Sequence, residues 1–159
     1  MIEIRPLRKD DEFKDLVSLS REFFEEYGSH HKGFFALDAL RDDDIVSYFS
    51  NLLDNDDGEV IVAREEGRIV GYIAVCVRKQ PGYWKVKRVG DISGLMVQNA
   101  YRRRGIARQL MDKAKEFFEK KGVKYFTVYT AIENRGAIKF YEQSGLQPLY
   151  TTMLGKVPE

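Results

Sequence analysis

Two neighbouring runs of β-branched and apolar residues constrain the fold of this chain more than any other feature. The first run is Val60–Ala63 and the second extends from Ile69 to Val77, with the turn Glu65-Glu66-Gly67-Arg68 between them. Valine and isoleucine favour strands, and two such runs joined by a short turn containing glycine predict an antiparallel β-hairpin. The chain must therefore build a sheet around this hairpin.

The residues before the hairpin have helical periodicity. Apolar side chains recur on one helical face from Phe13 to Tyr27, and either Asp10 or Asp11 is a candidate N-cap for this helix. A second helix is predicted from about Asp38 to Leu53. Alternation at Ile2 and Ile4 predicts a short strand at the start of the chain.

After the hairpin, the pattern predicts strands that alternate with helices. This order predicts an α/β (α+β) fold, with a mixed central sheet and helices on both faces, in one domain over residues 1–159. In chain order, the predicted elements are a strand at Val89–Val97, a helix at Arg103–Lys121, a strand at Tyr125–Thr130, a helix at Asn134–Ser144 and a strand at Tyr150–Leu154.

Composition narrows the functional class. The single cysteine, Cys76, lies in an apolar run, is expected in the core and excludes an internal disulfide, so a cytoplasmic location is expected. No apolar run reaches membrane-spanning length, and no signal peptide or membrane association is expected. A net charge of +1 and an acidic first segment, with 7 Lys/Arg against 15 Asp/Glu in residues 1–58, argue against nucleic-acid binding.

The segment from Leu95 to Arg108 carries the chemistry. A predicted strand ends, a short loop follows, and a helix begins with small residues in its first turn. The first amides of a helix lack intrahelical partners and lie at the positive end of its dipole, so a phosphate group can bind there. Three consecutive arginines, Arg102 to Arg104, add charge-assisted donors. These arginines could also form a solvated basic cluster or a nucleic-acid patch.

This arrangement closely resembles the acetyl-CoA-binding signature of the GNAT superfamily of N-acetyltransferases, (Gln/Arg)-x-x-Gly-x-(Gly/Ala). Here it is filled by Arg102-Arg103-Arg104-Gly105-Ile106-Ala107. The second half of the family pattern follows at the right distance, from Asn134 to Leu146. The resemblance covers the chain from Asp91 to Leu146.

The resemblance implies how the cofactor is held. The backbone of the strand at 95–97 should bind the pantetheine arm, where this strand separates from its neighbour, and one amide should polarise the thioester carbonyl. The turn that follows should wrap the pyrophosphate. Asn134 should lie near the pantetheine, although it is also a good helix N-cap. The cofactor-binding residues expected from this resemblance are Leu95, Met96, Val97, Arg102, Arg103, Arg104, Gly105, Ile106, Ala107, Arg108 and Asn134.

The resemblance also assigns two candidate catalytic residues. Tyr141 matches the family's proton donor to the leaving thiolate; otherwise it packs a helix against the sheet. Asp91 aligns with a carboxylate that can take the proton of the amine. The alternative is that Asp91 is a strand-end residue with a salt-bridge partner such as Arg88. Tyr129 stands where some relatives carry a glutamate, so that second route is absent.

These features predict an N-acetyltransferase that transfers an acetyl group from acetyl-CoA to a primary amine by direct attack, without a metal. The alternative function is a non-catalytic acyl-CoA-binding regulatory module. The expected partner is a small-molecule or peptide amine, with a possible homodimer, and the sequence does not identify the acceptor. The roles of His30, His31 and Trp84 also stay open.

Overall fold

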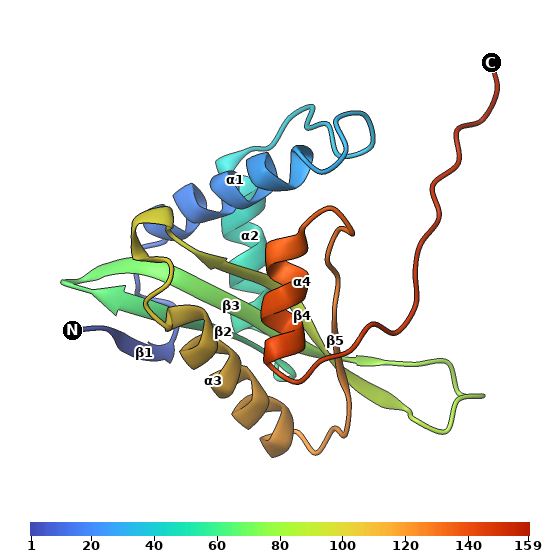
Figure 1. Ribbon diagram of the computed structural model, residues 1–159. Helices are drawn as coiled ribbons and strands as arrows, with labels where there is room; N and C mark the ends of the chain where they lie inside the picture. The colour runs from blue at the N-terminus through green and yellow to red at the C-terminus, as the bar shows by residue number, and fades with distance from the viewer.

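The computed structural model describes residues 1–159, as a five-stranded sheet with helices on its two faces (Figure 1). The mixed sheet with helices confirms the fold class expected from the sequence. In chain order the elements are β1 (Glu3–Pro6), α1 (Lys14–Gly28), α2 (Asp42–Leu53), β2 (Gly58–Glu65), β3 (Arg68–Lys79), β4 (Arg88–Val97), a 3₁₀ turn η1 (Asn99–Tyr101), α3 (Ile106–Lys120), β5 (Phe126–Val128) and α4 (Arg135–Gln143).

The strands lie in the sheet in the order of the sequence, β1-β2-β3-β4-β5. The first four strands are antiparallel, and β4 and β5 are parallel because α3 crosses between them. The predicted hairpin is β2–β3, and its turn contains Gly67 at φ +79°. This left-handed conformation explains the glycine, since side chains with a Cβ rarely adopt it.

Each face of the sheet carries its own hydrophobic core. One face packs against α1 and α2 through a cluster that includes Leu16, Phe49 and Tyr72. The other face packs against α3, where Leu110 and Met111 are buried, with α4 beside it (Figure 1). Strands covered on both faces explain why the hairpin sequence is apolar almost continuously. The longest helices have 15 residues, and none reaches the length and hydropathy of a membrane-spanning segment.

Three predicted boundaries differ from the structure. The helix α3 begins at Ile106 and not at Arg103, because Arg103 (φ +63°) and Gly105 (φ +77°) have left-handed backbones that a right-handed helix cannot contain. The helix α2 begins at Asp42, four residues later than predicted, and β5 is three residues long.

The predicted strand at Tyr150–Leu154 is absent. These residues have no backbone hydrogen bonds and extend away from the rest of the fold, although their residue types favour a strand (Figure 1). A strand needs a paired neighbour to satisfy its backbone groups, and no strand pairs with this segment.

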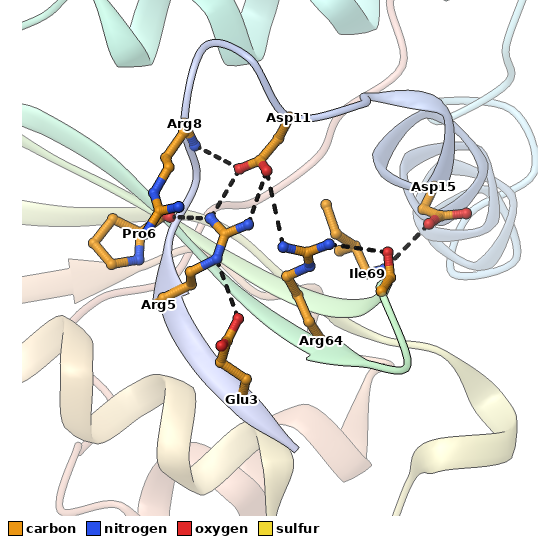
Figure 2. Close-up of polar contacts among 9 residues, drawn as sticks. Glu3, Arg5, Pro6, Arg8, Asp11, Asp15, Arg64 and Ile69 are labelled. Carbon is orange, nitrogen blue, oxygen red and sulfur yellow. Dashed lines mark hydrogen bonds and ion pairs between the residues drawn. The ribbon is translucent and has the colours of Figure 1, made fainter. Parts of the chain in front are cut away.

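Four charged residues connect β1, the start of α1 and the β2–β3 hairpin; we call Arg5, Asp11, Asp15 and Arg64 the charged corner. Figure 2 shows Asp11 between Arg5 and Arg64. Arg5 donates two hydrogen bonds to the Asp11 carboxylate, at 2.8 and 2.9 Å, and Arg64 lies 3.9 Å from it. Asp11 therefore does not cap α1, whose N-cap position is held by Phe13.

The Asp11 carboxylate has its partners within the corner, whereas the Nε of Arg64 is buried without an acceptor. The Arg5 guanidinium and the Arg8 amide, which donates at 2.7 Å, lower the pKa of the Asp11 carboxyl to about 2, against the cost of its burial. Asp15 accepts the Ile69 amide at 3.1 Å and so fixes α1 to the start of β3 (Figure 2).

Candidate active site

The turn between β4 and α3 has an unusual backbone; we call residues 102–108 the crossover turn. Two left-handed residues lie within it, Arg103 and Gly105. A positive φ is unusual for arginine and marks strain that the surrounding structure maintains. A Cβ placed on Gly105 would meet no atom within 4 Å, so the turn opens into free space. Turns that contain left-handed residues can point successive amides to one concave side.

The amides at the start of α3 have no partner in the chain. Gly105 provides no side-chain cap, and the first amide that bonds back into the helix is that of Gln109, to the Gly105 carbonyl at 3.1 Å. The amides of residues 105–108 are therefore free donors at the positive end of the helix dipole. A pyrophosphate needs such donors, and the backbone of the turn fits that group.

The arginines of the turn divide into two pairs. The Arg102 guanidinium donates to the Val97 carbonyl at 3.0 Å and to Glu26 at 2.8 Å, so it connects β4 to α1. Arg104 lies 3.6 Å from Glu65 and 5.0 Å from the centre of the Tyr101 ring. Arg103 and Arg108 are exposed and have no carboxylate partner. The positive charge available to a ligand therefore comes mainly from these two residues.

The strand β4 leaves one edge free just before the turn. It pairs with β3 as far as Val97, but its pairing with β5 extends only from Gly90 to Ile92. On the β5 side, the backbone of residues 95–97 has no strand partner. An extended ligand with amide groups can add to such an edge in the way a strand does. The expected separation of this strand from its neighbour is therefore present in the fold.

Asp91 lies within the paired part of β4, opposite Cys76 of β3. Its carboxyl is half-buried, and burial raises its pKa from the ordinary value, against a smaller opposing effect of Arg78. The suggested salt bridge to Arg88 is wrong, because Arg88 lies 3.7 Å from Asp57 and donates to the Lys121 carbonyl. Residues three apart on a strand face opposite sides, which separates Arg88 from Asp91.

Tyr141 lies on α4, half-buried against the core that α3 covers. Burial, and secondly the nearby Tyr27 hydroxyl, raise the pKa of Tyr141 to about 12. The phenol is therefore protonated at neutral pH, and its hydroxyl has no hydrogen-bond partner in the chain. A neutral hydroxyl without a partner can donate a proton or a hydrogen bond to a ligand.

Asn134 is the N-cap of α4. Its side-chain oxygen accepts the Ala137 amide at 3.2 Å, so the structural role expected from the sequence is present. The Asn134 amide group keeps its own donors, because capping uses only the oxygen. A contact with a ligand is therefore compatible with the cap.

Two residues near the site were not singled out from the sequence. Tyr27, at the end of α1, lies close to the Tyr141 hydroxyl and packs against Phe35, with 4.6 Å between the ring centres. Tyr48 of α2 bonds to Ser93, the extra residue of a β-bulge in β4. Bulges often lie near active sites, where they redirect side chains.

His30, His31 and Trp84, whose roles the sequence does not assign, have mainly local contacts. The His31 ring accepts the Phe34 amide at 3.0 Å, and the His30 ring packs at 5.9 Å from Tyr27. Trp84 is exposed in the loop between β3 and β4, which projects from the body of the fold (Figure 1). No group of three or more His, Cys, Asp or Glu side chains has the geometry of a metal site.

The strand order, the free β4 edge and the free amides of the crossover turn are the features expected from the two sequence motifs. The sequence model of the Acetyltransferase (GNAT) family matches residues 2–146. The chain therefore belongs to the GNAT family, as the two sequence motifs predicted.

Similar sequences carry related names. An uncharacterised N-acetyltransferase of Archaeoglobus fulgidus is 32% identical over 146 residues, which cover 92% of this chain and 93% of the relative. An uncharacterised N-acetyltransferase of Methanocaldococcus jannaschii is 28% identical over 91% of this chain, but the match spans only 60% of that relative's length.

Solved structures share the fold at low sequence identity. The BH1408 protein of Bacillus halodurans, in a tetramutant form, has a TM-score of 0.84 and 19% identity, with 98% of this chain and 99% of that chain covered. The aminoglycoside N-acetyltransferase AAC(6')-Iy, solved in complex with CoA, has a TM-score of 0.75 and 18% identity, with 99% and 95% covered.

Proposed function

We propose that this protein is an N-acetyltransferase that transfers the acetyl group of acetyl-CoA to a primary amine by direct attack. The observation that carries the proposal is the crossover turn, whose free amides and unpaired arginines lie directly after a strand with a free edge. The same turn supports a pyrophosphate, and the free edge at residues 95–97 supports a pantetheine arm. Family membership supports acetyl-CoA as the ligand that joins both groups.

The reaction assigns one role to each of two side chains. When bound, acetyl-CoA supplies an acetyl group activated as a thioester. Asp91 accepts the proton that the amine nitrogen loses as it forms its bond to the acetyl carbon. Its raised pKa makes it a better proton acceptor than an exposed aspartate. Tyr141 donates its proton to the departing sulfur, and no covalent bond to the protein is required.

We propose the class of acceptor from a property that all candidate acceptors share, a primary amine. A primary amine is protonated at neutral pH, and the half-buried Asp91 carboxylate is an acidic group that can orient it and then deprotonate it. The structure of AAC(6')-Iy with a bisubstrate analogue of CoA and acetylneamine motivates including aminoglycosides among the acceptors to test. Polyamines, amino acids, lysine side chains and peptide N-termini complete the panel.

Two measurements test the proposal. Acetyl-CoA at about a hundred times its dissociation constant should stabilise the fold by roughly 2.7 kcal/mol, measured by thermal unfolding. Acetyl-pantetheine, which lacks the pyrophosphate, is the matched control and should stabilise it much less. Release of free CoA should then depend on an amine of the panel. If acetyl-CoA does not stabilise the protein, the assignment of acetyl-CoA as its ligand is wrong. If acetyl-CoA binds but no amine of the panel is acetylated, the result favours a non-catalytic regulatory module.

A further inference from the structure

The face of the sheet that α1 and α2 cover becomes polar towards the end of β3. Alternate residues of a strand point to the same face. On this face, β3 presents the buried Tyr72 and Ala74, then the half-buried Cys76, and finally the exposed Arg78. Arg78 therefore stands at the margin of the core that the two helices cover.

The register of the sheet adds two polar residues to this margin. Cys76 lies opposite Asp91, and Asp91 lies opposite Thr127, so these residues share one face with Arg78. The Arg78 guanidinium donates to the Thr127 hydroxyl at 3.4 Å. Because β4 separates β3 from β5 by roughly 9.5 Å, the Arg78 side chain extends across β4 on the face that carries Asp91. We call Arg78, Asp91 and Thr127 the polar margin.

The two opposite charges of the polar margin do not neutralise each other by contact. Arg78 forms no ion pair with any carboxylate of the chain, and its one hydrogen bond goes to a neutral hydroxyl. The Asp91 carboxyl has no hydrogen-bond donor, and burial raises its pKa against a smaller opposing effect of Arg78. A cation and an anion that are close but not in contact suit a ligand that carries both charges.

Two tyrosines from neighbouring elements border the polar margin. Burial is the main cause of the raised pKa of Tyr48 on α2, and the charge of Asp91 adds to it. The pKa of Tyr129 is raised mainly by Tyr150, while the charges of Arg78 and Asp91 also act on it. Tyr129 is 74% exposed. The margin is therefore bounded by α2 on one side and open to solvent beside Tyr129.

We propose that the acceptor of this protein is an amino acid, held with its amine at Asp91 and its carboxylate at Arg78. The inference rests on the proposed function, in which Asp91 takes the proton of the attacking amine. A guanidinium presents parallel N–H donors that match the two oxygens of a carboxylate, and it neutralises one negative charge. The products are the N-acetyl amino acid and CoA, whose sulfur takes its proton from Tyr141.

Arg78 is the residue that sets acceptor specificity in this arrangement. An amine without an anion leaves the guanidinium without a partner, and a polyamine brings a second positive charge towards it. An amino acid satisfies both charges of the polar margin at once. It is also oriented by them, because reversing it would place its carboxylate against Asp91 and its ammonium against Arg78.

Matched acceptors test the inference with the full-length enzyme. The standard amino acids and β-alanine are each compared with the carboxamide of the same compound, which keeps the amine and removes the negative charge. For the best amino acid, kcat/KM should exceed that of its carboxamide about tenfold or more, because a hydrogen bond to a charged group is lost. An enzyme that acetylates the carboxamide equally well, or acetylates only amines without a carboxylate, overturns the inference and leaves the proposed function intact.

Variants of Arg78 assign the preference to one side chain. Arg78→Gln should lower kcat/KM for the best amino acid about tenfold, mainly through KM, and change that for its carboxamide less than about twofold. Arg78→Lys keeps the charge and should restore part of the preference. Arg88→Gln, which removes a guanidinium that lies 3.7 Å from Asp57, is the matched control and should keep it. Equal losses for both acceptors in Arg78→Gln would limit Arg78 to an effect on Asp91 and overturn the inference.

Thermal unfolding separates a failure of this inference from a failure of the proposed function. With saturating CoA, which carries no acetyl group, one amino acid of the set should raise the melting temperature more than its carboxamide does. Arg78→Gln should remove this difference. That result without turnover would keep the binding assignment and reject the catalytic function. Neither binding nor turnover with any amino acid would overturn the inference.

Discussion

The charged corner and the crossover turn use the same kinds of residue in opposite ways. In the corner, the guanidinium of Arg5 bonds to Asp11 at 2.8 and 2.9 Å, and the pKa of Asp11 falls to about 2. In the turn, Arg103 and Arg108 have no carboxylate, and the amides that begin α3 have no acceptor. Donors satisfied within the chain stabilise the fold, whereas donors left free are available to a ligand.

Two glycines give the strongest test of this contrast. Gly105 of the turn and Gly67 of the β2–β3 hairpin share a left-handed φ, +77° and +79°, and open surroundings. Either one changed to glutamate should lose about 1–2 kcal/mol of stability through backbone strain. Only Gly105→Glu should also abolish the roughly 2.7 kcal/mol stabilisation by acetyl-CoA, because it places a carboxylate at the pyrophosphate. Equal acetyl-CoA shifts in both variants would remove the distinction between the two regions.

Tyr141 separates chemistry from binding within the site. Tyr141→Phe should lower kcat by about a hundredfold, because a proton donor is lost, while the dissociation constant of acetyl-CoA stays the same. The melting temperature should change little, since the hydroxyl has no partner in the chain. Tyr83→Phe, in the exposed β3–β4 loop, is the control. Wild-type turnover in Tyr141→Phe would leave this tyrosine with a packing role only.

Asp91 should show stability and activity moving in opposite directions. Burial raises its pKa, so the folded state holds the proton more tightly than the unfolded state. Stability is therefore lost as pH rises from the unfolded pKa of about 3.9 through the raised folded value. Asp91→Asn should raise the melting temperature at pH 7 and lower kcat about tenfold, with water as the remaining proton acceptor. Melting curves at pH 3 and pH 7 check the sign; a variant less stable than wild type at pH 7 contradicts it.

Asp11 should affect stability alone. Asp11→Asn should cost about 1 kcal/mol at pH 7, because Arg5 loses a charged acceptor, and should leave acetyl-CoA binding unchanged. The pKa of Asp11 is lowered, so its contribution is complete above the unfolded pKa of about 3.9 and is lost as pH falls towards 2. Asp10→Asn, at an exposed neighbour without contacts, is the control. Urea unfolding at pH 7 and pH 2.5 measures both variants; equal losses would contradict the role of the corner.

The smallest difference is expected from single arginines. Arg103→Gln should raise KM for acetyl-CoA about threefold and leave the melting temperature unchanged, because an exposed charge contributes roughly 0.5–1 kcal/mol. Arg68, which pairs with Asp15 at 3.1 Å, should contribute to stability and not to the binding of acetyl-CoA. Arg68→Gln should lower stability by a few tenths of a kcal/mol, about the value of an exposed pair, without changing KM. If the two variants have identical KM values for acetyl-CoA, the arginine without a carboxylate partner contributes no more to binding than the paired one.

Local sequence patterns predicted the hairpin and the strand-turn-helix order because these depend on neighbouring residues. The β2–β3 hairpin follows from two apolar runs and one turn, and the Asn134 cap follows from its position before α4. Sequence patterns were less informative where backbone dihedral angles determine the residue at which an element begins. The helical periodicity that begins near Arg103 gave no sign of the positive φ there, so α3 was predicted to begin three residues early.

Contacts between distant segments could not be predicted from this sequence. Tyr48 and Ser93 are 45 residues apart, and the proximity of Tyr27 to Tyr141 depends on how α1 and α4 dock. The prediction of a strand at Tyr150–Leu154 was wrong for a related reason. Its residue types are right for a strand, but pairing is a property of the neighbour as well as of the segment. The assigned roles of Asp91, Tyr141 and the cofactor-binding residues stay predictions for the experiments above.

One side chain connects the two sides of the proposed site. Arg102 belongs to the crossover turn, but its guanidinium holds Glu26 of α1 and the Val97 carbonyl of β4. Displacement of this guanidinium at the turn would therefore also disturb the end of α1, where Tyr27 contributes to the raised pKa of Tyr141. Thermodynamic linkage makes any such coupling reciprocal: the factor by which acetyl-CoA changes the affinity for the amine equals the factor by which the amine changes the affinity for acetyl-CoA. Arg102 is thus a residue through which binding at the crossover turn can be coupled to the end of α1.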